Sequence, residues 1–373
     1  MLFIDGIPGE YPNDPSGQCN SDSSSPTPQF NLDQLSLDCR KEQPTPIDPN
    51  LPQSSKIKPN GKTRVSFIVP NEEKPQNAGW ILSKSTAGTY VSVGTERGFI
   101  GAAMSKATAL LLIDRDLEVI SFNRINIALL QAAKSIKHYR TLRRRSPFLE
   151  WKKAANNPGV SPSSKALLEN RETWRWWRNK VRHEKRFRNF HAPINQLLPK
   201  GAFKGANYLF IDKYFRKLQT MARSNRIACE PAELTNKQEI RRIAKKLEQQ
   251  PNRLSVLDLS NAWQYIRPID FVTLLKNTRG ASGQDGILLV TKRSGGQWDY
   301  FGFTFGFIFS IPSKINLPSR LLKVAIRSNK SGVTSGEIVL VPNSIDGAIE
   351  PKPSLFQKLA KLLGLREVIP APS

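Results

Sequence analysis

The sequence predicts an α/β fold, in which a mostly parallel β-sheet carries helices on both faces. Two short and almost continuously apolar strands, residues 89–94 and 109–114, are each followed by a helical stretch, residues 98–104 and 117–136. Strands that are buried on both faces read as apolar runs of this kind. The alternation resumes further along, with predicted strands at 226–230, 254–258 and 286–290 and predicted helices at 210–223, 237–249 and 269–276. Strand, helix and strand at these lengths indicate βαβ units.

The two ends of the chain differ from this core. Residues 1–62 are rich in Pro, Ser, Asn, Asp and Gln, a composition that does not offset its own ordering entropy, and we expect a disordered tail. The run 65–69 predicts a strand or a segment that docks on the domain, which we expect to span 63–345. Strands at 298–309 and 338–342 predict an antiparallel end to the sheet. The last residues, 346–373, form a second tail with an amphipathic helix at 354–365, which we expect to pack on the domain or lie on a membrane surface.

A basic insertion, residues 138–205, interrupts the α/β pattern. It is rich in Arg, Lys and Trp, and residues 172–190 predict one helix on which Trp174, Trp177 and Val181 share a face. The aromatic residues suit stacking on exposed bases or anchoring at an anionic lipid interface. Alternatively, they pack on the core while the arginines remain in solvent.

The net charge of +25 predicts a polyanionic partner, because cationic side chains attract phosphates and anionic surfaces. We expect nucleic acid ahead of an anionic membrane surface. The residues expected to contact it lie in the insertion: Arg143, Arg144, Arg145, Lys152, Lys153, Arg175, Arg178, Arg182 and Arg186.

Cysteine and histidine usage predicts no disulfide framework and no metal site. The three cysteines are Cys19, Cys39 and Cys229, and all three histidines lie in the insertion without metal-ligand spacing. No signal-peptide pattern and no long apolar run are present. We therefore expect a reducing, cytoplasmic location.

Gly94 and Asp114 form the most informative pair. Gly94 ends the first predicted strand, and Asp114 ends the second strand twenty residues later. In folds that bind nucleotide-type cofactors, a glycine turn lets the backbone approach the ligand and an acid after the next strand accepts from ribose hydroxyls. The spacing therefore predicts a cofactor site at this edge of a Rossmann-like sheet.

With these residues the chain resembles the class I S-adenosylmethionine-dependent methyltransferase superfamily, and residues 90–99 are also similar to a poorly characterised bacterial family of that shape. The resemblance implies S-adenosylmethionine as cofactor, held near Gly94, Glu96, Gly98 and Asp114. It also implies an acid near the adenine, for which Glu230 or Glu233 stands at the matching position, and of the two we name Glu233.

The resemblance further implies that residues after the strand 254–258 face the transferred methyl group. Asp258 or Asn261 would hold an acceptor amine or hydroxyl, and Trp263 or Tyr265 would stack on a planar group. Methyl transfer needs mainly alignment and exclusion of water, so it requires no catalytic triad.

The glycine spacing departs from the family pattern. Gly94, Gly98 and Gly101 are spaced G-x-x-x-G-x-x-G, and Thr95 and Glu96 fill the centre of the loop. The Glu96 carboxylate either crowds the methionine part of the cofactor or contacts its ammonium group, and the glycines alternatively serve close packing of helix on sheet. Two functions follow as hypotheses: a methyltransferase-like protein recruited to a polyanion, or a catalytically inactive Rossmann-like scaffold that binds nucleic acid or an anionic surface.

Overall fold

The computed structural model describes residues 68–70, 72–198, 200–250, 253–294 and 297–310, together with the backbone of 340–341. The predicted tail 1–62 and the predicted helix 354–365 lie outside the described residues. Of the run 65–69, Ile68 and Val69 are described, and both are buried against the domain without forming a strand.

The described strands form one sheet in the order β3-β2-β1-β4-β5-β6-β7. Their bounds are β1 Thr89–Val93, β2 Ala109–Asp114, β3 Ile227–Pro231, β4 Leu254–Ser260, β5 Ser282–Ser294, β6 Gln297–Thr304 and β7 Leu340–Val341. The first five strands of this order pair in parallel, and β6 pairs antiparallel with β5. The mostly parallel sheet with an antiparallel end is therefore confirmed, and its order 3-2-1-4-5 is Rossmann-like.

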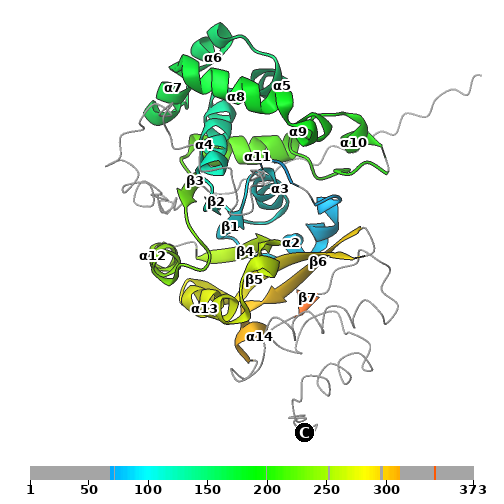
Figure 1. The fold of residues 1–373 in the computed structure, drawn as a ribbon, viewed down its shortest axis with the longest axis vertical. Helices are drawn as coiled ribbons and strands as arrows, with labels where there is room; N and C mark the ends of the chain where they lie inside the picture. The colour runs from blue at the N-terminus through cyan, green and yellow to red at the C-terminus, as the bar shows by residue number, and fades with distance from the viewer. Residues whose placement is uncertain are drawn as a thin grey trace, which may run out of the picture.

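The two faces of the sheet carry separate apolar cores, because successive side chains on a strand point to opposite faces. Tyr90, Leu110 and Leu112 belong to one core, and Val91, Leu111 and Ile113 belong to the other. The first core is covered by α3 Glu96–Met104, α4 Leu117–Ala132 and α11 Asp212–Arg223. The second is covered by α12 Lys237–Glu248, α13 Pro268–Thr278 and α14 Phe305–Ser310. Figure 1 shows α4 and α11 above the strands and α13 and α14 below them.

Three short elements complete the α/β part: η1 Pro75–Ala78, α2 Gly79–Ser83 and η2 Ala262–Tyr265. The prediction that a strand runs to residue 309 is wrong, because α14 begins at Phe305. There the Phe307 N–H donates to the Thr304 hydroxyl, and Phe305 and Ile308 are buried in the second core. Burial of a helical face outweighs the strand preference of these aromatic residues.

The basic insertion is a group of helices that lies on α4 and α11, at the top of Figure 1. They are α5 Ile136–Arg144, α6 Phe148–Ala154, α7 Pro162–Glu169, α8 Arg171–His183, α9 Lys185–Phe190 and α10 Ile194–Leu197. The single helix predicted for 172–190 is wrong, since Glu184 adopts an extended conformation and its carboxylate caps α9 by accepting from the Arg186 N–H. A second helix thus starts where the first ends.

The aromatic side chains of the insertion form its core. Trp151, Trp177, Phe187 and Phe190 are at most 1% exposed, and Trp177 stacks on Phe122 of α4 with ring centroids 4.5 Å apart. For these four side chains the structure therefore supports the hypothesis that they pack on the core beneath solvated arginines. Base stacking by Trp151 and Trp177 is excluded by their burial.

Candidate functional site

The Gly94 turn lies at the carboxyl end of β1, which is the edge where open α/β sheets bind ligands. Gly94 has φ +92°, a left-handed value that favours glycine, and a Cβ built on it would meet no atom within 4 Å. The turn is anchored by Asn123 of α4, whose amide donates to the Gly94 carbonyl at 2.9 Å. The turn therefore presents open space above its backbone.

Asp114 lies directly beside this turn, because Val93 and Ile113 are paired across β1 and β2. Its carboxylate accepts from the Asp116 N–H at 2.9 Å, while Asp116 in turn caps α4. Burial raises the pKa of Asp114 to about 6, and the nearby Asp116 carboxylate adds to this rise. Gly94 and Asp114 are thus brought together as predicted, with an acid that titrates close to neutral pH.

The two candidate acids after β3 have different surroundings. Glu233 lies two residues beyond β3 and forms an ion pair of 3.2 Å with Arg115, in which both side chains are more than one-third exposed. The Ala232 N–H donates to the Asp114 carbonyl, so this loop adjoins the Gly94 and Asp114 edge. Glu230 is buried in an ion pair with Arg242, which leaves Glu233 as the acid open to a ligand.

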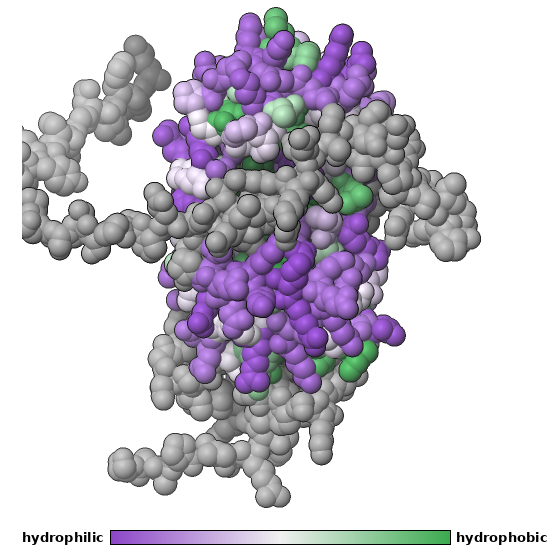
Figure 2. Space-filling model, turned by 90° about the vertical axis from the view of Figure 1, so that its left-hand side faces the viewer, coloured by the Kyte–Doolittle hydropathy of each residue, from purple (hydrophilic) through white to green (hydrophobic). Residues whose placement is uncertain are grey.

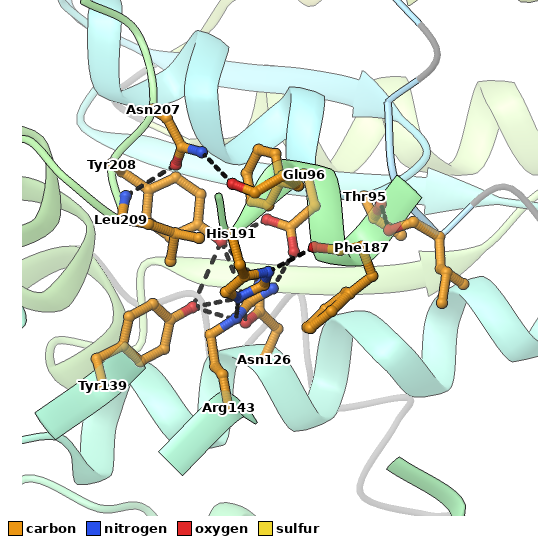
Figure 3. Close-up of polar contacts among 12 residues, drawn as sticks. Thr95, Glu96, Asn126, Tyr139, Arg143, Phe187, His191, Asn207, Tyr208 and Leu209 are labelled. Atoms are coloured by element: carbon orange, nitrogen blue, oxygen red, sulfur yellow. Dashed lines mark hydrogen bonds and ion pairs between the residues drawn. The ribbon is translucent and has the colours of Figure 1, made fainter. Parts of the chain in front are cut away.

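Glu96 does not face the turn, which corrects the expectation that it contacts a cofactor. Its side chain is 0% exposed and forms an ion pair with Arg143 of α5, and it also accepts from the Tyr208 hydroxyl. Figure 3 shows Arg143 at the centre of a polar network with Asn126, Tyr139 and His191. Since every one of these groups is buried, the network fastens the insertion to the start of α3.

Arg143 is also corrected as a polyanion contact, because its guanidinium is fully buried. Gly98 is corrected for a similar reason: a Cβ there would lie 2.4 Å from Leu112 Cδ2, and one at Gly101 would lie 2.0 Å from the Tyr90 hydroxyl. These two glycines serve close packing of α3 on the sheet.

Asp258 belongs to a second buried network, at the carboxyl end of β4. Its Oδ2 lies 3.0 Å from Arg97 Nε and accepts from the Tyr90 hydroxyl at 2.7 Å. Both members of the ion pair are less than 10% exposed. Asp258 is therefore not presented to an acceptor, which corrects its expected catalytic role to one of holding Arg97.

Glu72 joins this network from the segment that precedes the first helix. Its carboxylate accepts from the hydroxyls of Ser260, the last residue of β4, and Thr291 of β5. Burial raises the pKa of Glu72, opposed by the Arg97 guanidinium. Ser260 has φ +50°, a strained value for a side chain other than glycine. The end of β4 thus combines a strained residue, Ser260, with two buried acids, Glu72 and Asp258.

The remaining predicted residues lie just beyond β4. Asn261 is partly exposed and precedes η2. The Trp263 indole donates to the Thr291 carbonyl at 2.8 Å and packs against Phe271, whereas Tyr265 is 83% exposed. Asn261 and Tyr265 are thus accessible, and Trp263 is partly engaged in packing.

No sequence pattern assigned a role to Arg97, Glu72 or Tyr208, which belong to the two buried networks. One signal was available: Glu96 and Arg97 are adjacent charges in a helix whose other residues are apolar or small. Charges in such a helix need buried partners. The partners themselves are 161 positions away for Arg97 and 47 for Glu96, so no local pattern identifies them.

The cationic residues of the insertion other than Arg143 reach the surface. Those that are exposed are Arg144, Arg145, Lys152, Lys153, Arg175, Arg182 and Arg186, and Arg178 is partly exposed. Figure 2 shows mostly hydrophilic residues on the upper part of the molecule, where the insertion lies. The described residues contain no cluster of three or more potential metal ligands, and none of their helices is long and apolar enough to cross a membrane.

These features define a Rossmann-like α/β protein with a glycine turn, an acid beside it and a basic helical insertion. The chain belongs to the family described as "Domain of unknown function (DUF7790)", whose match spans residues 67–301. No curated protein matches the chain. Among solved structures, the rRNA methyltransferase aviRa from Streptomyces viridochromogenes matches with 14% identity and a TM-score of 0.29, over 65% of this chain and 83% of that chain.

Proposed function

We propose that this protein is methyltransferase-like and binds S-adenosylmethionine at the turn formed by Gly94 and Asp114, while its basic insertion recruits a polyanion. The observation that carries this proposal is the placement of Asp114 beside a left-handed glycine with open space above it. Backbone approach at Gly94 and a carboxylate for ribose hydroxyls are the two requirements of a nucleoside cofactor at this edge.

The residues present fit such a cofactor on its ribose and adenine sides. Asp114 would accept from the ribose hydroxyls, and Glu233 would lie on the adenine side, free to leave its exposed pair with Arg115. The buried Asn123 Oδ1 has no hydrogen-bond partner, which leaves one acceptor beside the Gly94 turn unused. When bound, S-adenosylmethionine would supply an electrophilic methyl group.

The chain's own residues would orient the acceptor and exclude water. Asn261 is partly exposed at the end of β4, where an acceptor amine or hydroxyl would meet its amide. Asp258 would act only as a positioning residue, because it holds Arg97 and Tyr90 rather than an open site.

The test is calorimetry of the full chain with S-adenosylmethionine and S-adenosylhomocysteine. We expect micromolar binding that is lost in Asp114→Ala and kept in Asp212→Ala, a control that removes a half-exposed acid from α11. If the wild-type chain gives no heat and no thermal shift with either compound, the cofactor proposal fails.

A second candidate function is a catalytically inactive scaffold that binds a polyanion. The observation in its favour is that the Thr95 hydroxyl donates to the Ile68 carbonyl at 2.6 Å, while Glu96 is held by Arg143. Both side chains in the centre of the loop are thus used inside the protein. Polyanion binding without any cofactor binding would select this function.

A further inference from the structure

Four arginines of α8 form one continuous stripe. Arg171, Arg175, Arg178 and Arg182 are spaced by 4, 3 and 4 residues along the helix Arg171–His183. At 3.6 residues per turn this spacing places them on one face, and at 1.5 Å per residue they span roughly 16 Å. The opposite side of the helix is buried through Thr173, Trp177 and Val181. The stripe therefore points away from the core.

The stripe carries little neutralising charge. Arg171, Arg178 and Arg182 form no ion pair within the part of the chain that the structure describes. Arg175 pairs with Glu172, but both side chains are more than half exposed, and such pairs are weak. Desolvation and the neighbouring Arg182 lower the pKa of Arg178, which indicates that the cations of the stripe repel one another. An anionic partner would relieve this repulsion.

The stripe extends onto α5. The Arg178 guanidinium donates to the Arg144 carbonyl, and Arg144 itself is exposed. Cations from two helices thus lie together, fixed by a backbone contact between those helices.

The aromatic residues of α8 are less exposed than its arginines: Trp177 is buried, and Trp174 and Trp176 are partly exposed. Trp177 is 0% exposed, and the Trp174 indole donates to the Ser146 carbonyl. The partly exposed Trp176 lies under the Lys180 ammonium, 5.6 Å from its ring centroid. In the described residues of the insertion, the exposed large apolar side chains are aliphatic: Leu149, Ile194, Leu197 and Leu198.

Single-stranded nucleic acids are bound by aromatic platforms on which bases stack. Phosphates of a duplex, by contrast, are contacted by cations that need no aromatic surface. A row of exposed or partly exposed arginines, beside tryptophans that are at most partly exposed, matches the second chemistry.

We propose that the stripe Arg171, Arg175, Arg178 and Arg182, with Arg144 beside it, binds the sugar-phosphate backbone of double-stranded nucleic acid without reading its sequence. This inference rests on the recruitment part of the proposed function and names the polyanion. It is independent of whether the Gly94 turn binds a cofactor.

The experiment is fluorescence anisotropy of the full chain with a 20-base-pair RNA duplex, the matching DNA duplex and the single RNA strand, at several salt concentrations. One variant carries Arg171→Gln, Arg175→Gln and Arg182→Gln. A matched control carries Lys237→Gln, Arg241→Gln and Lys245→Gln, which removes the same charge from exposed positions of α12. A third variant replaces the same three α8 arginines by lysine.

We expect the duplexes to bind more tightly than the single strand. The α8 glutamine variant should lose at least tenfold in duplex affinity, and its salt slope should fall by about 2.7 if each arginine contacts one phosphate. The α12 control should change affinity by less than threefold, and the lysine variant should keep most of the binding. Thermal unfolding confirms that each variant is folded.

Equal losses in the α8 variant and the α12 control would overturn the stripe as the binding surface, since net charge alone would then explain binding. Single-strand affinity equal to or above duplex affinity would overturn the choice of partner. Absence of binding to all three probes would overturn the inference together with recruitment of nucleic acid, while calorimetry with S-adenosylmethionine still decides the cofactor site separately.

Discussion

Glu96 and Arg143 form an ion pair between the first turn of α3 and the basic insertion, and both side chains are 0% exposed. The pair joins the helix that follows the Gly94 turn to α5, with Tyr208 donating a further hydrogen bond to Glu96. The insertion is consequently part of the domain core and not an independent arm.

Removing one partner of this pair should destabilise the protein strongly, because a buried charge is left uncompensated. We expect Glu96→Gln or Arg143→Met to lower the free energy of unfolding by roughly 3 to 5 kcal/mol. The double variant Glu96→Gln and Arg143→Met should lose less than the sum of the single variants, as expected of residues in contact. Urea unfolding of the four proteins measures this coupling, and additive losses would contradict it.

Arg97 and Asp258 are expected to behave in the same way at the other side of α3. Asp258→Asn should reduce stability by about 3 kcal/mol, since Arg97 is buried and one of its nitrogens, Nη1, already has no hydrogen-bond partner. The same substitution should leave the affinity for S-adenosylmethionine unchanged below the melting temperature. Loss of cofactor affinity without loss of stability would instead restore a direct role for Asp258.

Gly94, in the first turn, and Gly101, in α3, should respond differently to alanine. Gly101→Ala places a Cβ 2.0 Å from the Tyr90 hydroxyl and should destabilise by about 1 to 3 kcal/mol, because the aromatic ring must shift. Gly94→Ala meets no atom within 4 Å and should cost about 1 kcal/mol, from its left-handed backbone alone. Thermal unfolding ranks the two variants, and the reverse order would contradict the packing role of Gly101.

The free energy of unfolding should depend on pH through the titration of Asp114. Its pKa of about 6 lies above the ordinary value of 3.8, so the folded state takes up a proton more readily than the unfolded state. Protonated Asp114 therefore contributes to the free energy of unfolding. This contribution is fully present below about pH 4 and is lost as the pH rises through 6. Asp114→Asn should therefore match the wild type near pH 4 and exceed it by about 3 kcal/mol above pH 7.

The difference between the two proteins isolates Asp114 from other titrating groups, such as the buried His191, whose pKa burial lowers. Cofactor affinity should follow the opposite trend and rise between pH 5 and 7, since the ionised carboxylate is the better acceptor for ribose hydroxyls. A stability difference that does not depend on pH would show that Asp114 is not shielded from water.

Much of the fold could be predicted from local patterns. The parallel strands and the placement of Gly94 beside Asp114 both depend on residues near one another in sequence or on neighbouring strands. The break at Glu184 and the helix at Phe305 could not be predicted, because in both cases packing and capping outweighed a continuous pattern.

The candidate site was predictable only in part. Asp114 ends β2 and Glu233 lies two residues beyond β3, positions that the strand pattern reveals. Glu96, Arg143 and Asp258 look like site residues in the sequence because charge is costly to bury. Whether such a charge faces a ligand or an internal partner depends on contacts between distant segments.

The sequence by itself thus determined the sheet, its glycine turn with the neighbouring acid, and the strong positive charge, because hydrophobic periodicity and net charge are local or summed properties. Only the tertiary structure decided which charges are available. It buried Glu96 with Arg143, Arg97 with Asp258 and Trp177 of α8 in the core, and it left the four arginines of α8 exposed or partly exposed. The physical reason is that burial of aromatic surface and pairing of desolvated charges depend on partners brought together from distant parts of the chain.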